Sequence, residues 1–86
     1  MSDWEIYYYK DNRGNEPVKK FIDQHRIKDQ VKIFDWISRL EELGPKAVRP
    51  LVEYLGKDIY ELRIKLTDTE TRILYFFKFK KCMILA

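Results

Sequence analysis

Three cationic residues lie within one short stretch of the sequence and could bind phosphate. Arg63 and Lys65 share one face of a predicted strand, and Arg72 lies on the strand that follows. Arginine suits this role because its planar guanidinium stays charged and can hold two phosphate oxygens at once. Charge on a strand more often serves only to keep an exposed surface solvated. The residues themselves leave both interpretations open, a phosphate-binding site and a solvated basic face.

Most familiar catalytic motifs are missing from the sequence. It has only three glycines, and it contains no glycine-rich phosphate loop, no G-x-S-x-G motif and no H-E-x-x-H motif. The single histidine, His25, and the single cysteine, Cys82, have no partner for a metal site, so we expect neither a metal nor a cofactor. Glu41 and Glu42 are adjacent, so they point to different sides of a helix. Any catalysis would depend on the cationic residues, with Glu61 as a candidate carboxylate beside them.

The cationic residues belong to a predicted hairpin from Ile59 to Phe79. Its first strand alternates, with one face apolar and the other charged because successive side chains point to opposite sides. The apolar face holds Tyr60, Leu62, Ile64 and Leu66, and the charged face holds Glu61, Arg63 and Lys65. Thr67 to Glu70 supplies a polar turn. From Arg72 to Phe79 both faces are mostly apolar, which predicts a central strand covered on both sides.

The N-terminal half predicts a strand followed by two helices. Three consecutive tyrosines favour a strand from Trp4 to Lys10. A short helix is expected from about Glu16 to His25, with Pro17 in its first turn.

The second helix is predicted from about Asp29 to Leu43, before Gly44 and Pro45 end it. Its apolar residues recur at helical spacing and are expected to form the core stripe laid across the sheet. That stripe consists of Val31, Phe34, Ile37, Leu40 and Leu43, and Ile33 and Trp36 widen it. Trp36 is the residue of this helix that we expect to be exposed.

Two further segments flank the hairpin. Lys46 to Lys57 is interpreted as a connector with one helical turn formed by Leu51, Val52 and Leu55. Cys82 to Ala86 predicts an apolar strand at the edge of the sheet. An unpaired apolar edge invites self-association, so we expect a homodimer formed through this C-terminal strand.

Length and composition indicate one α+β domain over residues 1–86. We expect a small antiparallel sheet of about four strands, with two antiparallel N-terminal helices packed on one face. The net charge of +3 permits nucleic-acid binding without requiring it. A single cysteine fits a reducing cytoplasm, and no run of residues has the length of a membrane span. We therefore expect a cytoplasmic protein without a membrane partner.

The order and spacing of these segments resemble the RelE superfamily of toxins, with the RelE/ParE-like fold. The matching stretches are YYYKDNRGNEPV near the start and LVEYLGKDIYELRIKLTDTETRILYFFKFKKCMIL after the helices. The most specific parts are Tyr60-Glu61-Leu62-Arg63 and the RILYFF motif that begins at Arg72. Within the superfamily, the chain is most similar to the HigB or phage-derived Gp49-like group.

The resemblance implies a toxin of a type II toxin–antitoxin system, an endoribonuclease (mRNA interferase) acting on the translating ribosome. In such enzymes the nucleotide's own 2′-hydroxyl attacks the adjacent phosphate, and basic residues stabilise the added charge. Arg63 and Arg72 fall where the family carries cationic site residues, Lys65 is a weaker third, and Glu61 is structural or catalytic. Further RNA contacts are expected from Lys78, Lys80 and Lys81. The implied partners are mRNA, the ribosome and a cognate antitoxin protein.

The chain departs from the family pattern at its C-terminal end. There the family continues into a segment of the form LLhgFxKKtxktP and a helix, whereas Ala86 is the last residue here. The comparison implies a C-terminally truncated domain with weak or absent RNA cleavage, since losing one positioned charge costs orders of magnitude in rate. One alternative is a non-catalytic module with the toxin fold that binds an antitoxin or RNA. Another is the ParE branch, whose members poison DNA gyrase.

Overall fold

The predicted hairpin forms the centre of the sheet. In the computed structural model, which describes residues 4–78 and 82–85, its strands are β3 (Ile59–Lys65) and β4 (Glu70–Lys78). The N–H of Leu66 donates to the carbonyl oxygen of Thr69 at 2.7 Å and closes the turn between them. Leu62, Ile64 and Ile73 are buried, as the alternation predicts.

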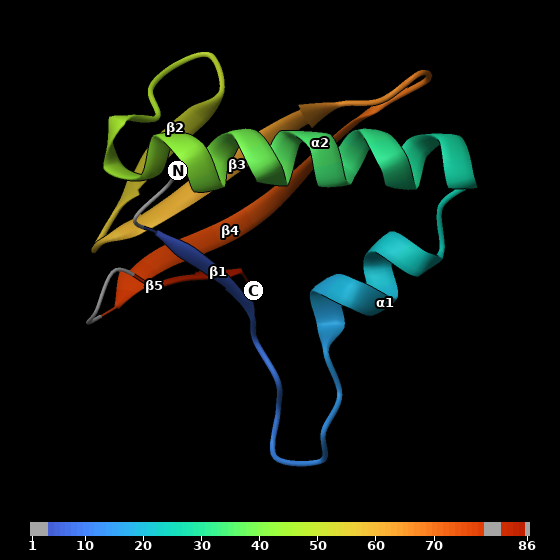
Figure 1. Ribbon diagram of the computed structural model, residues 1–86, viewed down its shortest axis with the longest axis horizontal. Helices are drawn as coiled ribbons and strands as arrows, with labels where there is room; N and C mark the ends of the chain where they lie inside the picture. The colour runs from blue at the N-terminus through green and yellow to red at the C-terminus, as the bar shows by residue number, and fades with distance from the viewer. Residues whose placement is uncertain (1–3, 79–81, 86) are drawn as a thin grey trace.

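The other elements surround this hairpin and confirm an α+β fold with two helices. They are β1 (Glu5–Tyr8), α1 (Pro17–Asp23), α2 (Ile27–Leu43), the 3-10 helix η1 (Gly44–Lys46), β2 (Val52–Gly56) and β5 (Cys82–Leu85). Helix α2 runs across the sheet, and α1 lies beyond one end of β1 (Figure 1). Val18 and Ile22 of α1 belong to the same buried cluster as the apolar face of the hairpin, so both helices contribute to one core.

The sheet differs from the expected one in strand number and direction. Its order is β1-β5-β4-β3-β2, so it has five strands. β1 pairs with β5 in parallel, and every other neighbouring pair is antiparallel. A purely antiparallel sheet of about four strands was therefore too simple an expectation. Both helices and three strands separate β1 from β5, so no short turn dictates their relative direction.

The C-terminal strand β5 is an interior strand, and the prediction of an unpaired apolar edge there is wrong. β5 pairs with β4 on one side and with β1 on the other. Met83 and Leu85 are fully buried. The edges of the described sheet are β1 and β2. Because β1 occupies the free side of β5, the expected route to a homodimer through a C-terminal edge is closed along Cys82–Leu85.

The predicted connector contains a strand instead of a helical turn. In β2, Val52 pairs with Leu62 and Glu53 pairs with Glu61. Lys57 and Asp58, with φ values of 53° and 63°, form the turn to β3. Positive φ at both central residues is typical of tight hairpin turns. The pairing with β3 buries Val52 and explains why the strand prevails over a short helix.

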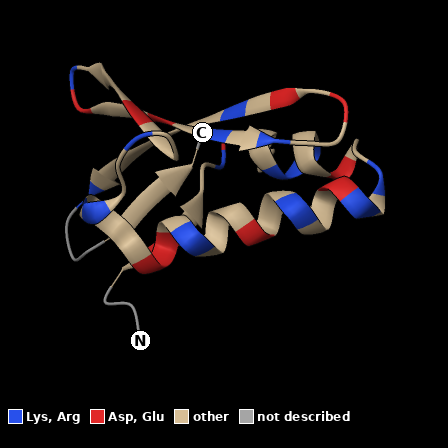
Figure 2. Cartoon of the chain, turned by 90° about the horizontal axis from the view of Figure 1, so that it is seen from above, with Lys and Arg blue, Asp and Glu red and all other residues tan. Residues whose placement is uncertain are grey.

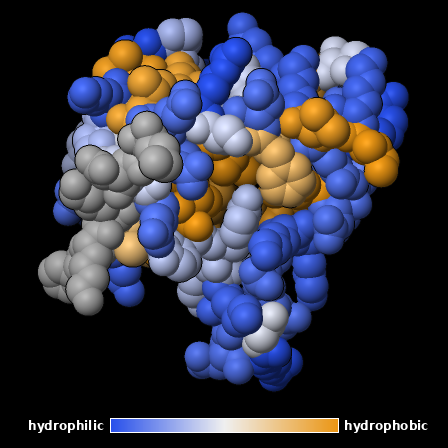
Figure 3. All heavy atoms as spheres, viewed as in Figure 1, coloured by the Kyte–Doolittle hydropathy of each residue, from blue (hydrophilic) through white to orange (hydrophobic). Residues whose placement is uncertain are grey.

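Helix α2 buries only part of the predicted apolar stripe. Ile33, Ile37 and Leu40 are buried, whereas Val31 and Phe34 are 64% and 44% exposed. Apolar side chains therefore reach the surface on the α2 side of the molecule (Figure 3). The apolar residues of α2 span too wide an arc for spacing alone to identify the face that packs. No helix in the described part of the chain combines the length and apolar character that crossing a membrane requires.

Aromatic rings fill the end of the core next to the C-terminus of α2. Tyr60 lies 5.4 Å from both Tyr75 and Phe77 between ring centroids, and Trp4 lies 5.1 Å from Phe77. Burial raises the pKa of the Tyr75 phenol, so this side chain stays neutral at physiological pH. These aromatic contacts hold β1 and the hairpin together on the helix side of the sheet. The opposite face of the sheet takes no part in them.

Candidate functional site

Arg63 and Arg72 lie opposite each other on the sheet face that points away from the helices. The two residues are directly paired between β3 and β4. Their neighbours Leu62 and Ile73 are buried in the core, so alternation directs both arginines to the other face. Like charges directly opposite each other destabilise a sheet. The pair therefore requires compensating charge nearby.

Two glutamates supply this compensation. Glu61 lies 3.9 Å from Arg63 (Oε1 to Nε) and 3.8 Å from Arg72 (Oε2 to Nη1). Oε1 of Glu70 lies 3.7 Å from Nη2 of Arg63 and 3.5 Å from Nη2 of Arg72. Each carboxylate thus contacts both guanidinium groups, and we call these four residues the Arg–Glu cluster. Basic and acidic residues lie next to each other along the strands of the sheet in Figure 2.

The ion pairs of the Arg–Glu cluster are loose. All four distances exceed the roughly 2.7–2.9 Å of a charge-assisted hydrogen bond. The side chain of Arg72 is 55% exposed, against 12% for Glu61. Exposed ion pairs of this kind contribute only about 0–1 kcal/mol. Arg72 can therefore exchange a carboxylate for another anion at small cost.

Arg63 adds an unsatisfied donor to the site. Its Nε is buried and has no hydrogen-bond partner among the described residues. The Oε1 of Glu61, at 3.9 Å, is too distant to accept a hydrogen bond from it. A buried donor without an acceptor costs about 1–3 kcal/mol. An oxygen of a bound anion could supply the missing acceptor after a small movement of the side chain.

The lysines predicted to bind RNA are not all near this cluster. Lys65 is exposed, shares the arginine face of β3 and pairs with Glu70, so it borders the site. Lys78 lies six positions beyond Arg72 on β4, which corresponds to about 20 Å along a strand. The structure thus brings together Arg63, Arg72, Lys65 and Glu61 and leaves Lys78 apart. Lys80 and Lys81 fall outside the described residues.

An apolar surface adjoins the cluster, contrary to the prediction that β4 is covered on both faces. Leu74, the cross-strand partner of Glu61, is 42% exposed, and Phe76 is half-buried. Among residues 4–78 and 82–85, both helices pack on the opposite side, so this face of β4 stays open. The same openness makes the Arg–Glu cluster accessible.

A cavity of about 290 Å³ lies beside Arg63 and is lined by Trp36, Pro50, Arg63, Lys65 and Glu70. Trp36 is half-buried and packs against the core, although sequence reasoning expected it to be exposed. Glu70, which the sequence places in the polar turn, is a further residue of the site. Its pairing with Lys65 in the hairpin register is the signal that could have identified it.

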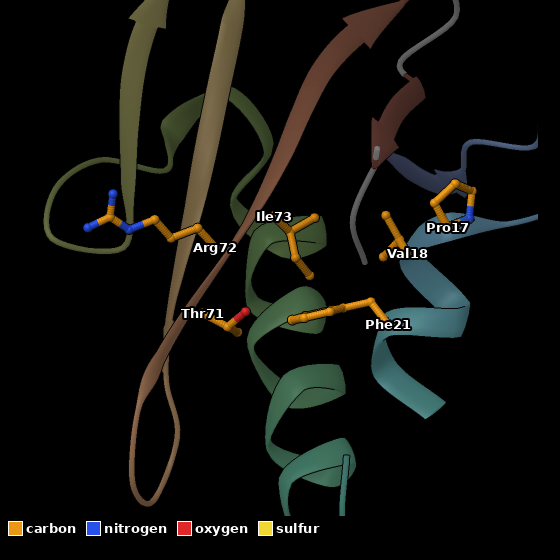
Figure 4. A pocket seen from close by; sticks show the side chains of 6 residues that line it. All are labelled: Pro17, Val18, Phe21, Thr71, Arg72 and Ile73. Carbon is orange, nitrogen blue, oxygen red and sulfur yellow. The ribbon is translucent and has the colours of Figure 1, made fainter. Parts of the chain in front are cut away.

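A second cavity, of about 240 Å³, is lined by Pro17, Val18, Phe21, Thr71, Arg72 and Ile73. It lies between α1 and β4 on the core side. The Arg72 side chain points away from the other five residues (Figure 4), so its guanidinium does not enter this cavity. The chemistry of the arginine pair therefore belongs to the open face.

Nothing in the described residues is arranged as a metal centre, since no group of three or more His, Cys, Asp or Glu side chains could hold an ion. The Arg–Glu cluster can bind an anion between its two guanidinium groups and can move a proton through a carboxylate. This arrangement suits chemistry on a phosphodiester.

Comparison with known proteins places the chain in a family. No curated protein matches it. A family model described as "Phage derived protein Gp49-like (DUF891)" matches residues 20–86, which include both strands of the arginine pair. The chain belongs to this Gp49-like family, a branch of the RelE-like toxins.

Proposed function

We propose that this protein is a type II toxin of the ribosome-dependent mRNA endoribonuclease class. The observation that carries the proposal is the cross-strand pair of Arg63, which is half-buried, and Arg72, which is exposed, on an open sheet face. Membership of a RelE-like family supports the same class. A ribosome-bound substrate would place the protein in the cytoplasm, and a small antitoxin that covers the open face would restrain it.

The two arginines act on the phosphate in this mechanism. The 2′-oxygen of a ribose forms a bond to the adjacent phosphorus, and the bond from phosphorus to the 5′-oxygen breaks. The products are a 2′,3′-cyclic phosphate and a 5′-hydroxyl. The added negative charge in the transition state lies on the non-bridging oxygens, which Arg63 and Arg72 contact from two sides. Arg63 gains an acceptor for its buried Nε in the same step.

Glu70 is the better placed carboxylate to take the 2′-hydroxyl proton. Its side chain is 34% exposed, whereas that of Glu61 is 12% exposed. Glu61, which contacts both guanidinium groups from below the surface, acts as a positioning residue. The proton that the leaving 5′-oxygen takes up comes from Lys65 or from water, since Lys65 is exposed beside Glu70.

Glu70→Gln provides a test of this assignment. The amide keeps the shape but removes a competing negative charge and the base, so binding of a non-cleavable RNA should tighten about threefold. Cleavage should fall about a hundredfold. Both can be measured by anisotropy with a 2′-deoxy-substituted oligonucleotide and by a translation-coupled cleavage assay. Glu42→Gln, an exposed carboxylate on α2, is the matched control. Unchanged cleavage in Glu70→Gln would assign the proton to another group.

The function itself is tested by expressing the 86-residue chain in bacteria and mapping mRNA ends. The expected result is growth arrest with cuts that depend on translation and carry 5′-hydroxyl ends. Intact mRNA during arrest, or cuts that persist when translation is blocked, would contradict the proposal.

A non-catalytic binding module is the second candidate. The Arg–Glu cluster contains two positive and two negative side chains, so it carries no net charge at neutral pH. A neutral cluster weakens attraction to RNA relative to a bare arginine pair and suits a protein partner that offers both charges. Tight antitoxin binding together with intact mRNA would favour this function.

A further inference from the structure

We propose that the cavity beside Arg63 is a nucleobase subsite, in which one base of single-stranded RNA stacks on Trp36. The inference rests on the proposed function, because it locates the nucleotide next to the phosphate held by the arginine pair. It assigns a nucleotide-binding role to α2, whose side chains take no part in the Arg–Glu cluster. The ligand is a single unpaired nucleotide, with its base in the cavity and its phosphate toward Arg63.

The cavity exists because β2 is shorter than β3 and leaves the C-terminal end of β3 without a partner on that side. The pairing of β2 with β3 runs only as far as Val52 and Leu62, and one further hydrogen bond joins the N–H of Arg63 to the carbonyl oxygen of Leu51 at 3.0 Å. Beyond that point the edge of β3 has no strand beside it in the described part of the sheet. Trp36 reaches this gap from α2, so residues of the helix side and of the arginine face line one cavity.

The size and the lining of the cavity suit a nucleobase. Its volume of about 290 Å³ is at the lower limit of small-molecule sites, which favours a single base over a larger group. Indole is a large flat surface for stacking, and stacking on an aromatic side chain tolerates any base. Trp36 is half-buried and packs against the core, so its ring is held in place before RNA binds.

Charged groups surround the cavity on the side where a phosphate would lie. Lys65 and Arg63 line it directly. The guanidinium of Arg39 lies over the Trp36 ring, 5.4 Å from its centroid, and a base that stacks on that face would take its place. Glu70 lines the cavity and also belongs to the Arg–Glu cluster, so its carboxylate can accept a hydrogen bond from an amino group of the base. A base in this cavity would thus be linked to the reacting phosphate through Glu70.

Tryptophan fluorescence tests this subsite without requiring cleavage. The chain has two tryptophans, and Trp4 lies against Phe77 in the core. A Trp4→Phe variant therefore reports on Trp36 alone. Titration with a short single-stranded RNA that is 2′-O-methylated at every position, and so has no 2′-hydroxyl that could attack a phosphate, should quench this emission. Emission that stays constant while anisotropy shows the RNA bound would overturn the proposal.

Substitutions of Trp36 provide a second test of the subsite, in which RNA affinity is measured. Trp36→Leu should weaken oligonucleotide binding about tenfold, and Trp36→Phe should retain most of the affinity because a ring remains. Phe34→Leu, which replaces an exposed aromatic on the same helix outside the cavity, is the matched control and should leave the affinity unchanged. Should Trp36→Leu fail to fold, Lys65→Gln at the cavity rim is expected to weaken binding at least threefold. Equal affinities for Trp36→Leu and the parent would overturn the subsite.

The outcomes separate this inference from the proposed function. If mRNA is cut and Trp36→Leu binds and cuts normally, the subsite is wrong and the function stands. If no mRNA is cut but Trp36→Leu weakens RNA binding, the subsite stands in a non-catalytic RNA-binding protein.

Discussion

Arg72→Ala is expected to lower translation-coupled mRNA cleavage at least a hundredfold and to leave the melting temperature nearly unchanged. The guanidinium stabilises charge that develops on the phosphate, and removal of one such donor typically costs about a hundredfold to a thousandfold in rate. Stability should change little because the side chain is 55% exposed and its ion pairs are long. Cleavage mapped by primer extension, together with thermal unfolding of the purified variant, measures both quantities.

The control for this result is Arg13→Ala, which removes an exposed arginine from the loop between β1 and α1. It lowers the net charge by the same amount and should leave cleavage at the parent level. Arg63→Ala should lower cleavage as strongly as Arg72→Ala, because the transition state loses one of its two guanidinium groups in either variant. Normal cleavage by Arg72→Ala would remove the arginine pair from the mechanism.

Gly44→Ala is expected to reduce the free energy of unfolding by about 2–4 kcal/mol. Gly44 ends α2 with φ 52° and ψ −127°, a conformation that side chains other than glycine rarely adopt. A Cβ here would also lie 2.6 Å from Cδ1 and 2.8 Å from Nε1 of Trp4. Because Trp4 packs in the aromatic end of the core, it cannot move away without loosening β1. Chemical denaturation of the purified variant measures the change.

Gly14→Ala separates the cost of the backbone conformation from the cost of the clash with Trp4. Gly14 also has a positive φ, of 85°, but a Cβ there would meet nothing within 4 Å. This variant should therefore lose only the conformational part, about 1 kcal/mol. If Gly44→Ala lowers the free energy of unfolding no more than Gly14→Ala does, the contact with Trp4 contributes nothing to the destabilisation. Recovery of stability in a Gly44→Ala, Trp4→Ala double variant, relative to the additive expectation, would identify the clash directly.

The local pattern of the sequence was sufficient for the central hairpin and for the arginine face. Period-two alternation in Tyr60 to Leu66 fixes which side chains face the core, since one residue of slip would bury Arg63 and expose Leu62. The polar turn then aligns the two strands, and Arg63 faces Arg72 as a result. The ELR and RILYFF motifs lie on these same strands, so the family could also be inferred from sequence.

Long-range packing decided what the sequence left open. The apolar residues of α2 permit several rotations, and contact with the sheet selected Ile33 over Phe34 for the core. An apolar segment such as Cys82–Leu85 can lie at an edge of a sheet or in its interior. Here pairing with β1 makes it an interior strand. Trp36 and Arg63 line one cavity because β2 does not extend along the C-terminal end of β3. No local pattern in the sequence predicts this difference in strand length. Alternation is a property of neighbours in the chain and can be read from them. The rotation of a helix, the order of strands and the shape of a cavity depend on contacts between distant residues, so the tertiary structure alone determined them.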